Sequence, residues 1–335
     1  MRGIAALLVV LFHLTLSAPE AHYGFELGVT GVDLFFIISG FVILMTVQKA
    51  KHWTDFVVSR ISRIYPTYWA CVTFTAILLL LTQHSPWLWF IWKYGINMTM
   101  FQVYLHVPDI DGPYWTMIIE MLFYIFMLGL LVTKKLNRVE AICTGLLLPV
   151  FYYGRYLGTM HPKAQQLLGT YLPLINHFPL FFAGILFYKI RFEGPRLWRY
   201  GLLALCFAVQ LILFRVGGRS AGVLSFTQYV GMLACYFTLF LLYVHNLLGF
   251  IVNKVTLFLG AISYSLYLIH QYLCLNILLP FAMGKLHMNL LCASFFFALP
   301  IVLGLAYGIH IWIEKPAMES IRAWYKSRKL KLSAG

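Results

Sequence analysis

Long apolar segments separated by short polar stretches dominate the chain. Ten of them predict membrane-spanning helices, because a helix needs about 20 apolar residues to cross a bilayer. They are residues 3–17, 28–48, 65–82, 114–133, 139–157, 171–190, 200–216, 225–248, 257–280 and 289–313. A further apolar segment, 86–105, starts with several Trp residues and contains Lys93, which favours a helix at the membrane interface. The pattern predicts an all-α, polytopic membrane protein.

The distribution of Lys and Arg predicts the orientation. With the N-terminus in the cytoplasm, 19 of the 25 Lys and Arg residues fall on the cytoplasmic side, as the positive-inside rule requires. The other six are Lys93, Arg155, Lys163, Arg215, Arg219 and Lys285. Counting 86–105 as a span would remove most of this bias. We therefore expect ten spans with both termini cytoplasmic, a transmembrane domain over 1–314, and a basic tail over 315–335 on anionic headgroups.

Composition agrees with this class and excludes others. The chain is 61% hydrophobic and 11% charged, whereas a soluble domain has about 25% charged residues. The net charge of +14 is spread over the ends of apolar segments, so we expect no nucleic-acid binding. The six Cys residues lack metal-ligand spacing and predict buried thiols, with no metal. The first segment has no A-x-A-like cleavage site, so we expect no signal peptide.

Arg2 and His13 bracket the first apolar segment, RGIAALLVVLFH. Eleven residues apart, they project from nearly one face of a helix and lie about 16 Å apart along its axis. Ionisable residues inside a membrane are costly and usually functional. Because histidine readily takes a proton near neutral pH, His13 is a candidate catalytic residue. The alternative is a packed histidine bonded to a backbone carbonyl.

Two carboxylates are expected near the depth of His13. Asp33 lies near the outer end of the second segment, and Glu120 lies six residues into the fourth. An acid beside a histidine fixes its tautomer and stabilises the imidazolium, so both are candidate catalytic residues. The alternatives are a helix-entry role for Asp33 and a structural ion pair for Glu120. Ser39 and Gly40 predict close helix packing.

Arg60 and Arg63 precede the third segment and share a helical face. With Arg2 they place three guanidinium groups on the predicted cytoplasmic side, and guanidinium binds phosphate bidentately. They are candidate ligands of a phosphorylated donor, or else ordinary membrane anchors. Further polar residues in or at the ends of the apolar segments are His177, His270 and Glu314, the last of which we expect to cap or ion-pair at its helix end.

Together these segments resemble the membrane acyltransferase-3 family. RGIAALLVVLFH is similar to its first-helix Arg-x10-His motif, GVDLFFIISGFVI to its second-helix motif and RISRIYPTYW to its Arg-x-x-Arg segment. YWTMIIEMLFY resembles its Trp-Ser-Leu-x-x-Glu-x-x-Phe-Tyr segment, with Thr116 and Met117 in place of Ser and Leu. ISYSLYLIH and IEKP resemble motifs of its late helices. The resemblance covers nearly the whole chain, in order.

The resemblance implies transfer of an acyl group, usually acetyl, from cytosolic acetyl-CoA to a hydroxyl of a carbohydrate across a bacterial cytoplasmic membrane. Known members modify exopolysaccharide and lipopolysaccharide O-antigen, and this chain resembles those without an additional esterase-like domain. The residues assigned by role are catalytic His13, Asp33 and Glu120; CoA-binding Arg2, Arg60 and Arg63; and substrate-binding Trp115, Tyr124 and His270. Whether His13 acts as a base or carries the acyl group is left open.

A transporter of a glycan or lipid-linked sugar is the alternative function, since many spans with intramembrane charges suit that class. Inverted repeats with broken helices would favour it, and the sequence shows no such pairing. For the acyltransferase, the acceptor is expected to bind segment 83–112, which is long enough to recognise it. Its polar residues are His84, Lys93, His106, Asp109 and Asp111.

Overall fold

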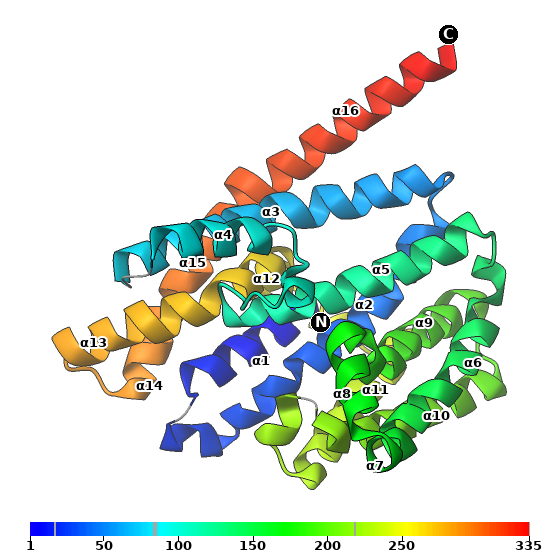
Figure 1. Ribbon diagram of the computed structural model, residues 1–335, viewed down its shortest axis with the longest axis horizontal. Helices are drawn as coiled ribbons and strands as arrows, with labels where there is room; N and C mark the ends of the chain where they lie inside the picture. Colours follow the sequence, from blue (N-terminus) through cyan, green and yellow to red (C-terminus); the bar gives the residue numbers. More distant parts are fainter. Residues whose placement is uncertain (17, 83–85, 218, 335) are drawn as a thin grey trace. The chain divides into compact units, whose positions relative to one another are not determined.

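The computed structural model describes residues 1–16, 18–82, 86–217 and 219–334, and His84 lies outside them. The described chain is mostly helical and contains no strand, which confirms the all-α prediction (Figure 1). The helices are α1 Arg2–Leu14, α2 Gly31–Gln48, α3 Trp53–Thr82, α4 Trp87–Asn97, α5 Trp115–Val132, α6 Val139–Tyr152, α7 Gly158–Met160, α8 Pro162–Tyr171, α9 Phe178–Glu193, α10 Leu197–Gly217, α11 Phe226–Val244, α12 Lys254–Leu273, α13 Leu279–Lys285, α14 Leu290–Cys292, α15 Leu299–Ile309 and α16 Lys315–Ala334.

The helices form two compact units. Unit 1 comprises residues 1–12, 16–49 and 116–260, and holds α2 and most of α5 to α11. Unit 2 comprises residues 13–15, 50–115 and 261–335, and holds α3, α4 and the helices from most of α12 onward. The division falls within α1, so that Arg2 belongs to unit 1 and His13 to unit 2.

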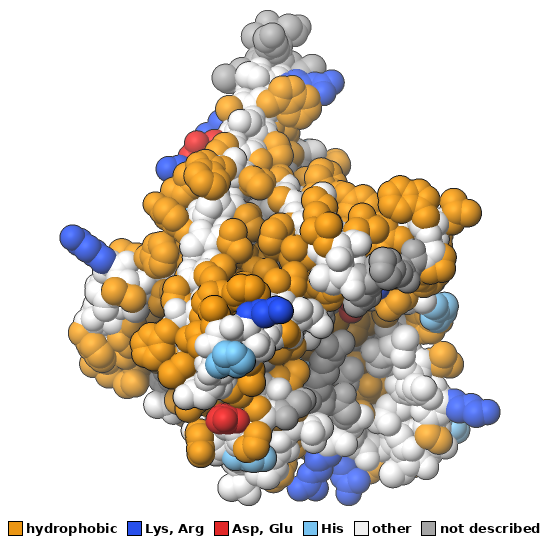
Figure 2. All heavy atoms as spheres, turned by 90° about the vertical axis from the view of Figure 1, so that its left-hand side faces the viewer, with side chains coloured by type: hydrophobic (Ala, Val, Ile, Leu, Met, Phe, Trp, Pro, Cys, Tyr) orange, Lys and Arg blue, Asp and Glu red, His pale blue; other side chains and the backbone are white. Residues whose placement is uncertain are grey.

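All ten predicted apolar segments correspond to helices, and seven helical stretches in the described chain are long and apolar enough to cross a membrane. α1 is a shorter apolar helix, and α4, with 11 residues, is too short to span a bilayer. Figure 2 shows a face on which hydrophobic side chains predominate over charged ones, as a lipid-facing surface requires. The protein is therefore an all-α polytopic membrane protein, and ten spans stays a prediction.

Two glycines let α2 and α9 pack closely in unit 1. A Cβ at Gly40 would lie 2.0 Å from the carbonyl oxygen of Phe181, and one at Gly184 would lie 2.1 Å from that of Ile37. Every residue from Phe178 to Ile190 is buried, so α9 is a core helix of the unit. The close packing predicted at Gly40 is confirmed, because only a small residue allows two helix backbones to approach this far.

Three π-helical turns interrupt the long helices of unit 2, each just before a proline. The turns are Cys274–Leu278, Ala293–Ala298 and His310–Glu314, followed by Pro280, Pro300 and Pro316. A proline has no N–H and its ring clashes with the carbonyl four residues earlier. In each case that carbonyl lies inside the π-helical turn, where the wider winding accommodates the clash without ending the helix.

A buried ionic network joins one end of α6, α9 and α10. The Arg199 side chain is 2% exposed; its Nε donates to Glu140 Oε1 at 2.8 Å and its Nη2 to Glu193 Oε2 at 3.2 Å. Lys189 Nζ donates to the same Glu193 oxygen at 2.9 Å. Because both cations are paired, their burial in the helix bundle is tolerated.

Candidate active site

His13 and His270 meet inside unit 2. His13 lies near the end of α1 and His270 lies near the end of α12; the Nε2 of His270 is 3.2 Å from the Nδ1 of His13. The two rings meet edge to face, with centroids 4.9 Å apart. His270 is fully buried, whereas His13 is half-buried. The structure therefore gives His13 a second histidine as its neighbour.

The hydrogen bonds of this pair determine which nitrogen of His13 carries a proton. The Nδ1 of His270 lies 2.8 Å from the carbonyl oxygen of Tyr267, which only accepts, so this nitrogen is the N–H of His270. A neutral His270 then accepts at Nε2, and His13 donates from Nδ1. A neutral His270 is favoured because burial of a charged imidazole is costly. The lone pair of His13 is consequently on Nε2.

Glu120 is held by two hydroxyl groups within unit 1. Ser39 donates to Oε1 at 2.7 Å, and Tyr124 donates to Oε2 at 2.6 Å. Both carboxylate oxygens therefore act as hydrogen-bond acceptors. Tyr124, assigned to the substrate from the sequence, therefore points toward Glu120. Ser39, expected only to allow close packing, makes a polar contact with Glu120.

Asp33 lies in a separate buried polar group of unit 1. It is 4% exposed, and its Oδ1 is 3.8 Å from the Nδ1 of His177. The hydroxyl of Tyr229 lies close enough to Asp33 for the two groups to interact electrostatically. Tyr229 in turn accepts from Gln210 Nε2 at 3.2 Å. Asp33 therefore shares its surroundings with His177, which the sequence offered as a further polar residue.

The two arginines that precede the third apolar segment, Arg60 and Arg63 of α3, are joined by a third from α16. Arg322 donates from Nε to the hydroxyl of Ser62 at 3.2 Å, and from Nη2 to the carbonyl of Ser59 at 3.5 Å. Arg60 donates to the Ser59 hydroxyl at 3.0 Å. Arg63 is close enough to Arg322 for their charges to interact. We name Arg60, Arg63 and Arg322 the arginine cluster; its like charges suit an anionic ligand.

The remaining assigned residues have simpler positions. Arg2 is half-buried in the first turn of α1, and Trp115 is half-buried as the first residue of α5. Glu314 is 2% exposed, and its Oε2 lies 3.1 Å from the Nδ1 of His310. Glu314 therefore has a histidine partner four residues earlier on the same helix face, and the expected ion pair stays a prediction.

Segment 86–112, the described part of the expected acceptor region, is tied together by its own polar residues. Gln102 donates to Asp109 at 2.7 Å. Asp111 accepts from the backbone N–H of Gly112 at 2.7 Å and from that of Tyr272 at 3.1 Å. Burial raises the pKa of Asp111 to about 7. The two hydrogen bonds act in the opposite direction and lower this pKa, whereas the charge of Asp109 raises it. Asp111 therefore anchors the segment to α12.

The sequence did not predict several contacts in this arrangement. The i, i+4 spacing of Glu120 and Tyr124 places them on one helix face, and could have revealed that bond. Nothing in the sequence pairs His13 with His270, which are 257 residues apart, or brings Arg322 to Ser62. Such contacts depend on how distant helices pack.

The fold and these buried ionisable groups define a multi-pass membrane protein with a polar centre inside each unit. The chain belongs to the family described as "Acyltransferase domain", whose model matches residues 1–311. The protein is therefore a membrane acyltransferase, which decides against the transporter alternative.

Two curated relatives agree with this class. The chain is 24% identical over 280 residues to "Putative acetyltransferase ORF330" of Acidianus two-tailed virus, covering 81% of this chain and 80% of the relative. It is 29% identical over 155 residues to "Exopolysaccharide production protein ExoZ" of Rhizobium meliloti (strain 1021), covering 44% and 46%. No solved structure matches the chain significantly.

Proposed function

We propose that this protein transfers an acetyl group from cytosolic acetyl-CoA to a hydroxyl of an extracytoplasmic polysaccharide, with His13 as the general base. The observation that carries the proposal is the chain of hydrogen bonds from Tyr267 through His270 to His13. These bonds favour the tautomer of His13 whose lone pair is on Nε2. In a catalytic triad, the acid fixes the tautomer of the histidine in the same way. Here a neutral imidazole takes the place that a carboxylate occupies in such triads.

The proposed reaction is direct transfer. The acceptor hydroxyl gives its proton to His13 Nε2 while its oxygen attacks the thioester carbonyl carbon. The carbon–sulfur bond then breaks, and the CoA thiolate takes the proton from His13. An O-acetyl ester and free CoA result, and His13 returns to its neutral form. His270 acts as a positioning residue, because it contacts His13 and needs no contact with either substrate.

The arginine cluster is proposed to hold the phosphates of acetyl-CoA. Arg60 and Arg63 are joined by Arg322, so three cations from α3 and α16 face one region of unit 2. Planar guanidinium groups bind phosphate oxygens through paired N–H donors. The tail over 315–335 would then contribute to donor binding through α16, in addition to any contact with anionic lipid headgroups.

The acceptor is proposed to be exopolysaccharide or lipopolysaccharide O-antigen, or a lipid-linked precursor, at a bacterial cytoplasmic membrane. The name of the relative from Rhizobium meliloti, an exopolysaccharide production protein, supports a polysaccharide. Segment 86–112, anchored through Asp111 to α12, offers the acceptor a fixed surface. The roles of Glu120 and Asp33 are proposed as holding the helices of unit 1 in position through their own partners.

The test measures acetyl transfer from radiolabelled acetyl-CoA by the purified protein and by membranes that contain it. We expect His13→Ala to lower kcat by roughly 10²–10⁴-fold, the usual contribution of a general base. His270→Ala should lower kcat with little change in the KM for acetyl-CoA. His270→Gln should recover part of that loss, because the Gln carbonyl oxygen can accept from His13 Nδ1.

The matched control is His245→Ala, which removes an exposed imidazole beyond the end of α11. It should leave kcat unchanged. Full activity of His13→Ala would overturn the proposal. Equal losses in the His270→Ala and His270→Gln variants would reject the positioning role and leave His270 as a packing residue.

A further inference from the structure

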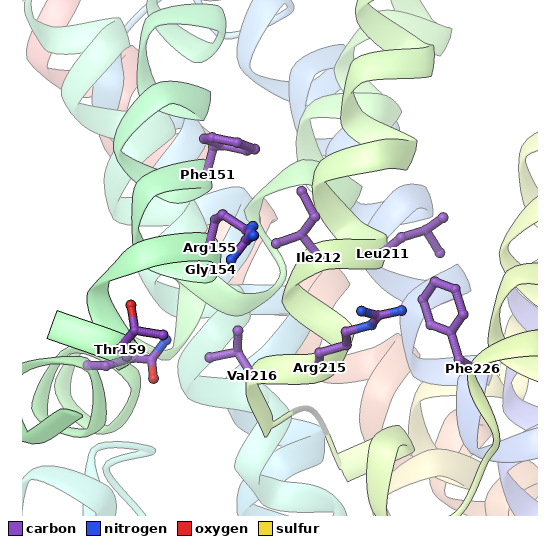
Figure 3. A pocket seen from close by; sticks show the side chains of 11 residues that line it. Phe151, Gly154, Arg155, Thr159, Leu211, Ile212, Arg215, Val216 and Phe226 are labelled. Atoms are coloured by element: carbon purple, nitrogen blue, oxygen red, sulfur yellow. The ribbon is translucent and has the colours of Figure 1, made fainter. Parts of the chain in front are cut away.

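A cavity of about 770 Å³ opens within unit 1, and none of its lining residues belongs to the candidate active site described above (Figure 3). Its walls come from the end of α6 with the turn that follows it, from α7 and α8, from the end of α10 and from the start of α11. The lining residues are Phe151, Gly154, Arg155, Gly158, Thr159, Gln165, Leu211, Ile212, Arg215, Val216 and Phe226. No carboxylate is among them, so the cavity is positively charged.

The two arginines keep their N–H groups available. Arg215 lies over the ring of Phe226, with its Cζ 4.6 Å from the ring centroid, and Arg155 lies 5.4 Å from that of Tyr156. Within the described chain, neither guanidinium forms an ion pair or hydrogen bond with a protein acceptor. Stacking uses the face of a guanidinium and leaves its edge free, which is the edge that binds phosphate.

The aliphatic part of the wall comes from one helix. Leu211, Ile212 and Val216 of α10 line the cavity together with two aromatic rings, and α10 is one of the helices long enough to span a membrane. Arg215 is 16 residues beyond Arg199 of the ionic network, about 24 Å along the same helix at 1.5 Å per residue. The cavity and the network therefore lie at opposite ends of α10.

We propose that this cavity is a binding site for the phosphate group of a membrane lipid. Arg155 and Arg215 bind the phosphate oxygens, and the acyl chains lie along the apolar side chains of α10. Two observations support this proposal. The cavity is lined by two arginines and by no Asp or Glu, and it lies at the end of the membrane-spanning helix α10, where lipid headgroups are found. The site is independent of the acyl-transfer proposal, because none of its residues takes part in that reaction.

Lipid retention by the purified protein tests this. Native mass spectrometry of detergent-solubilised protein would compare added phosphatidylglycerol with inorganic phosphate, alongside thermal unfolding of the same samples. Wild-type protein should retain phosphatidylglycerol and unfold at a higher temperature with it. Arg155→Gln combined with Arg215→Gln should weaken retention at least about tenfold, because two charge-assisted contacts are lost. Both side chains are exposed, so the variant should fold.

Lys163→Gln is the matched control, since it removes an exposed charge from α8 without lining the cavity. It should retain lipid like the wild type. Equal retention by the double variant and the wild type would overturn the proposal. So would stabilisation by inorganic phosphate alone, because the occupant would then be a free anion. Neither readout depends on acetyl transfer, so the two proposals fail separately.

Discussion

At the scale of single residues, the catalytic proposal depends on which nitrogen of His13 carries its proton. A histidine in an apolar segment indicates chemistry, but it does not reveal the tautomer. The carbonyl of Tyr267 and the ring of His270 supply that information through two hydrogen bonds. The carboxylates expected to orient His13 have partners of their own in unit 1, namely Ser39 and Tyr124 for Glu120 and His177 for Asp33, and their catalytic role stays a prediction.

Replacement of Arg322 tests the arginine cluster. Arg322→Gln should raise the KM for acetyl-CoA roughly tenfold or more, because a hydrogen bond to a charged group contributes about 1.5–3 kcal/mol. The kcat should change little, since the cluster is proposed to bind the phosphates of acetyl-CoA and not its reacting thioester. Lys326→Gln, an exposed position on the same helix, is the control for general loss of positive charge. Similar KM values for Arg322→Gln and wild type would exclude α16 from the donor site.

Asp111 gives the protein a pH-dependent stability. Burial raises its pKa in the folded state to about 7 from an ordinary value of 3.8. Between these values the folded protein binds a proton that the unfolded chain releases, so this contribution to stability is present in full below about pH 4 and is lost as the pH rises through 7. The midpoint of thermal unfolding in detergent should therefore rise as the pH falls from 8 to 5.

Asp111→Asn isolates that contribution. The Asn carbonyl oxygen still accepts from the backbone N–H groups of Gly112 and Tyr272, but the side chain no longer titrates. The difference in unfolding midpoint between variant and wild type should be larger at pH 8 than at pH 5. A difference that is the same at both values would show that Asp111 does not change its charge in this range.

At the scale of helices, close backbone contact explains the burial of α9 better than hydropathy does. α9 has only 16 residues, yet it is buried from Phe178 to Ile190 because Gly40 and Gly184 allow α2 to approach it. The sequence pattern marked both segments as apolar and Gly40 as a packing residue. It could not show which helix lies against Gly40, since every apolar segment offers a similar surface.

Gly40→Ala should destabilise unit 1. The added Cβ would lie 2.0 Å from a backbone carbonyl oxygen, and overpacking typically costs about 1–3 kcal/mol. Thermal unfolding in detergent should show a midpoint several degrees lower. Gly231→Ala in α11 is the control, because its Cβ meets no atom within 4 Å; it should be neutral or slightly stabilising. Equal midpoints for the two variants would contradict the packing described for α2 and α9.

Single proline residues explain the interruptions in the long helices of unit 2. Pro280, Pro300 and Pro316 lie where a straight α-helix would clash, and π-helical turns absorb each of them. α16 continues the last helix in this way and runs beside α3 (Figure 1). Lys329 and Tyr325 of α16 both bond to Asp55 Oδ1, at 2.7 and 2.8 Å. The tail is thereby attached to α3.

At the scale of the whole molecule, the charge distribution predicts the membrane orientation. Most Lys and Arg residues fall on the side assigned to the cytoplasm, and both termini should lie there. Alkaline phosphatase fused after Asn137 should be inactive, because this enzyme is active only outside the cytoplasm, and a fusion after His161 should be active. Green fluorescent protein at the same positions provides the reciprocal control. The opposite pattern would reverse the orientation on which the direction of acyl transfer depends.

The sequence by itself determined the class of the protein. Apolar segments of spanning length and few charges require helices in a membrane, since a bilayer offers no other partners for backbone N–H and C=O groups. The ordered motifs around Arg2, Asp33, Arg60, Glu120 and His270 pointed to the acyltransferase family, and the family match confirms it. These properties are local, because each depends on residues that are close in the chain.

Only the tertiary structure decided which polar residues meet. The contacts of His13 with His270, Ser39 with Glu120 and Arg322 with Ser62 join residues 257, 81 and 260 positions apart. Hydropathy does not specify them, because lipid tails are as apolar as the helices and leave neighbour choice to close packing and buried hydrogen bonds. The partners of the catalytic candidates, and the cavity between Arg155 and Arg215, follow from that choice.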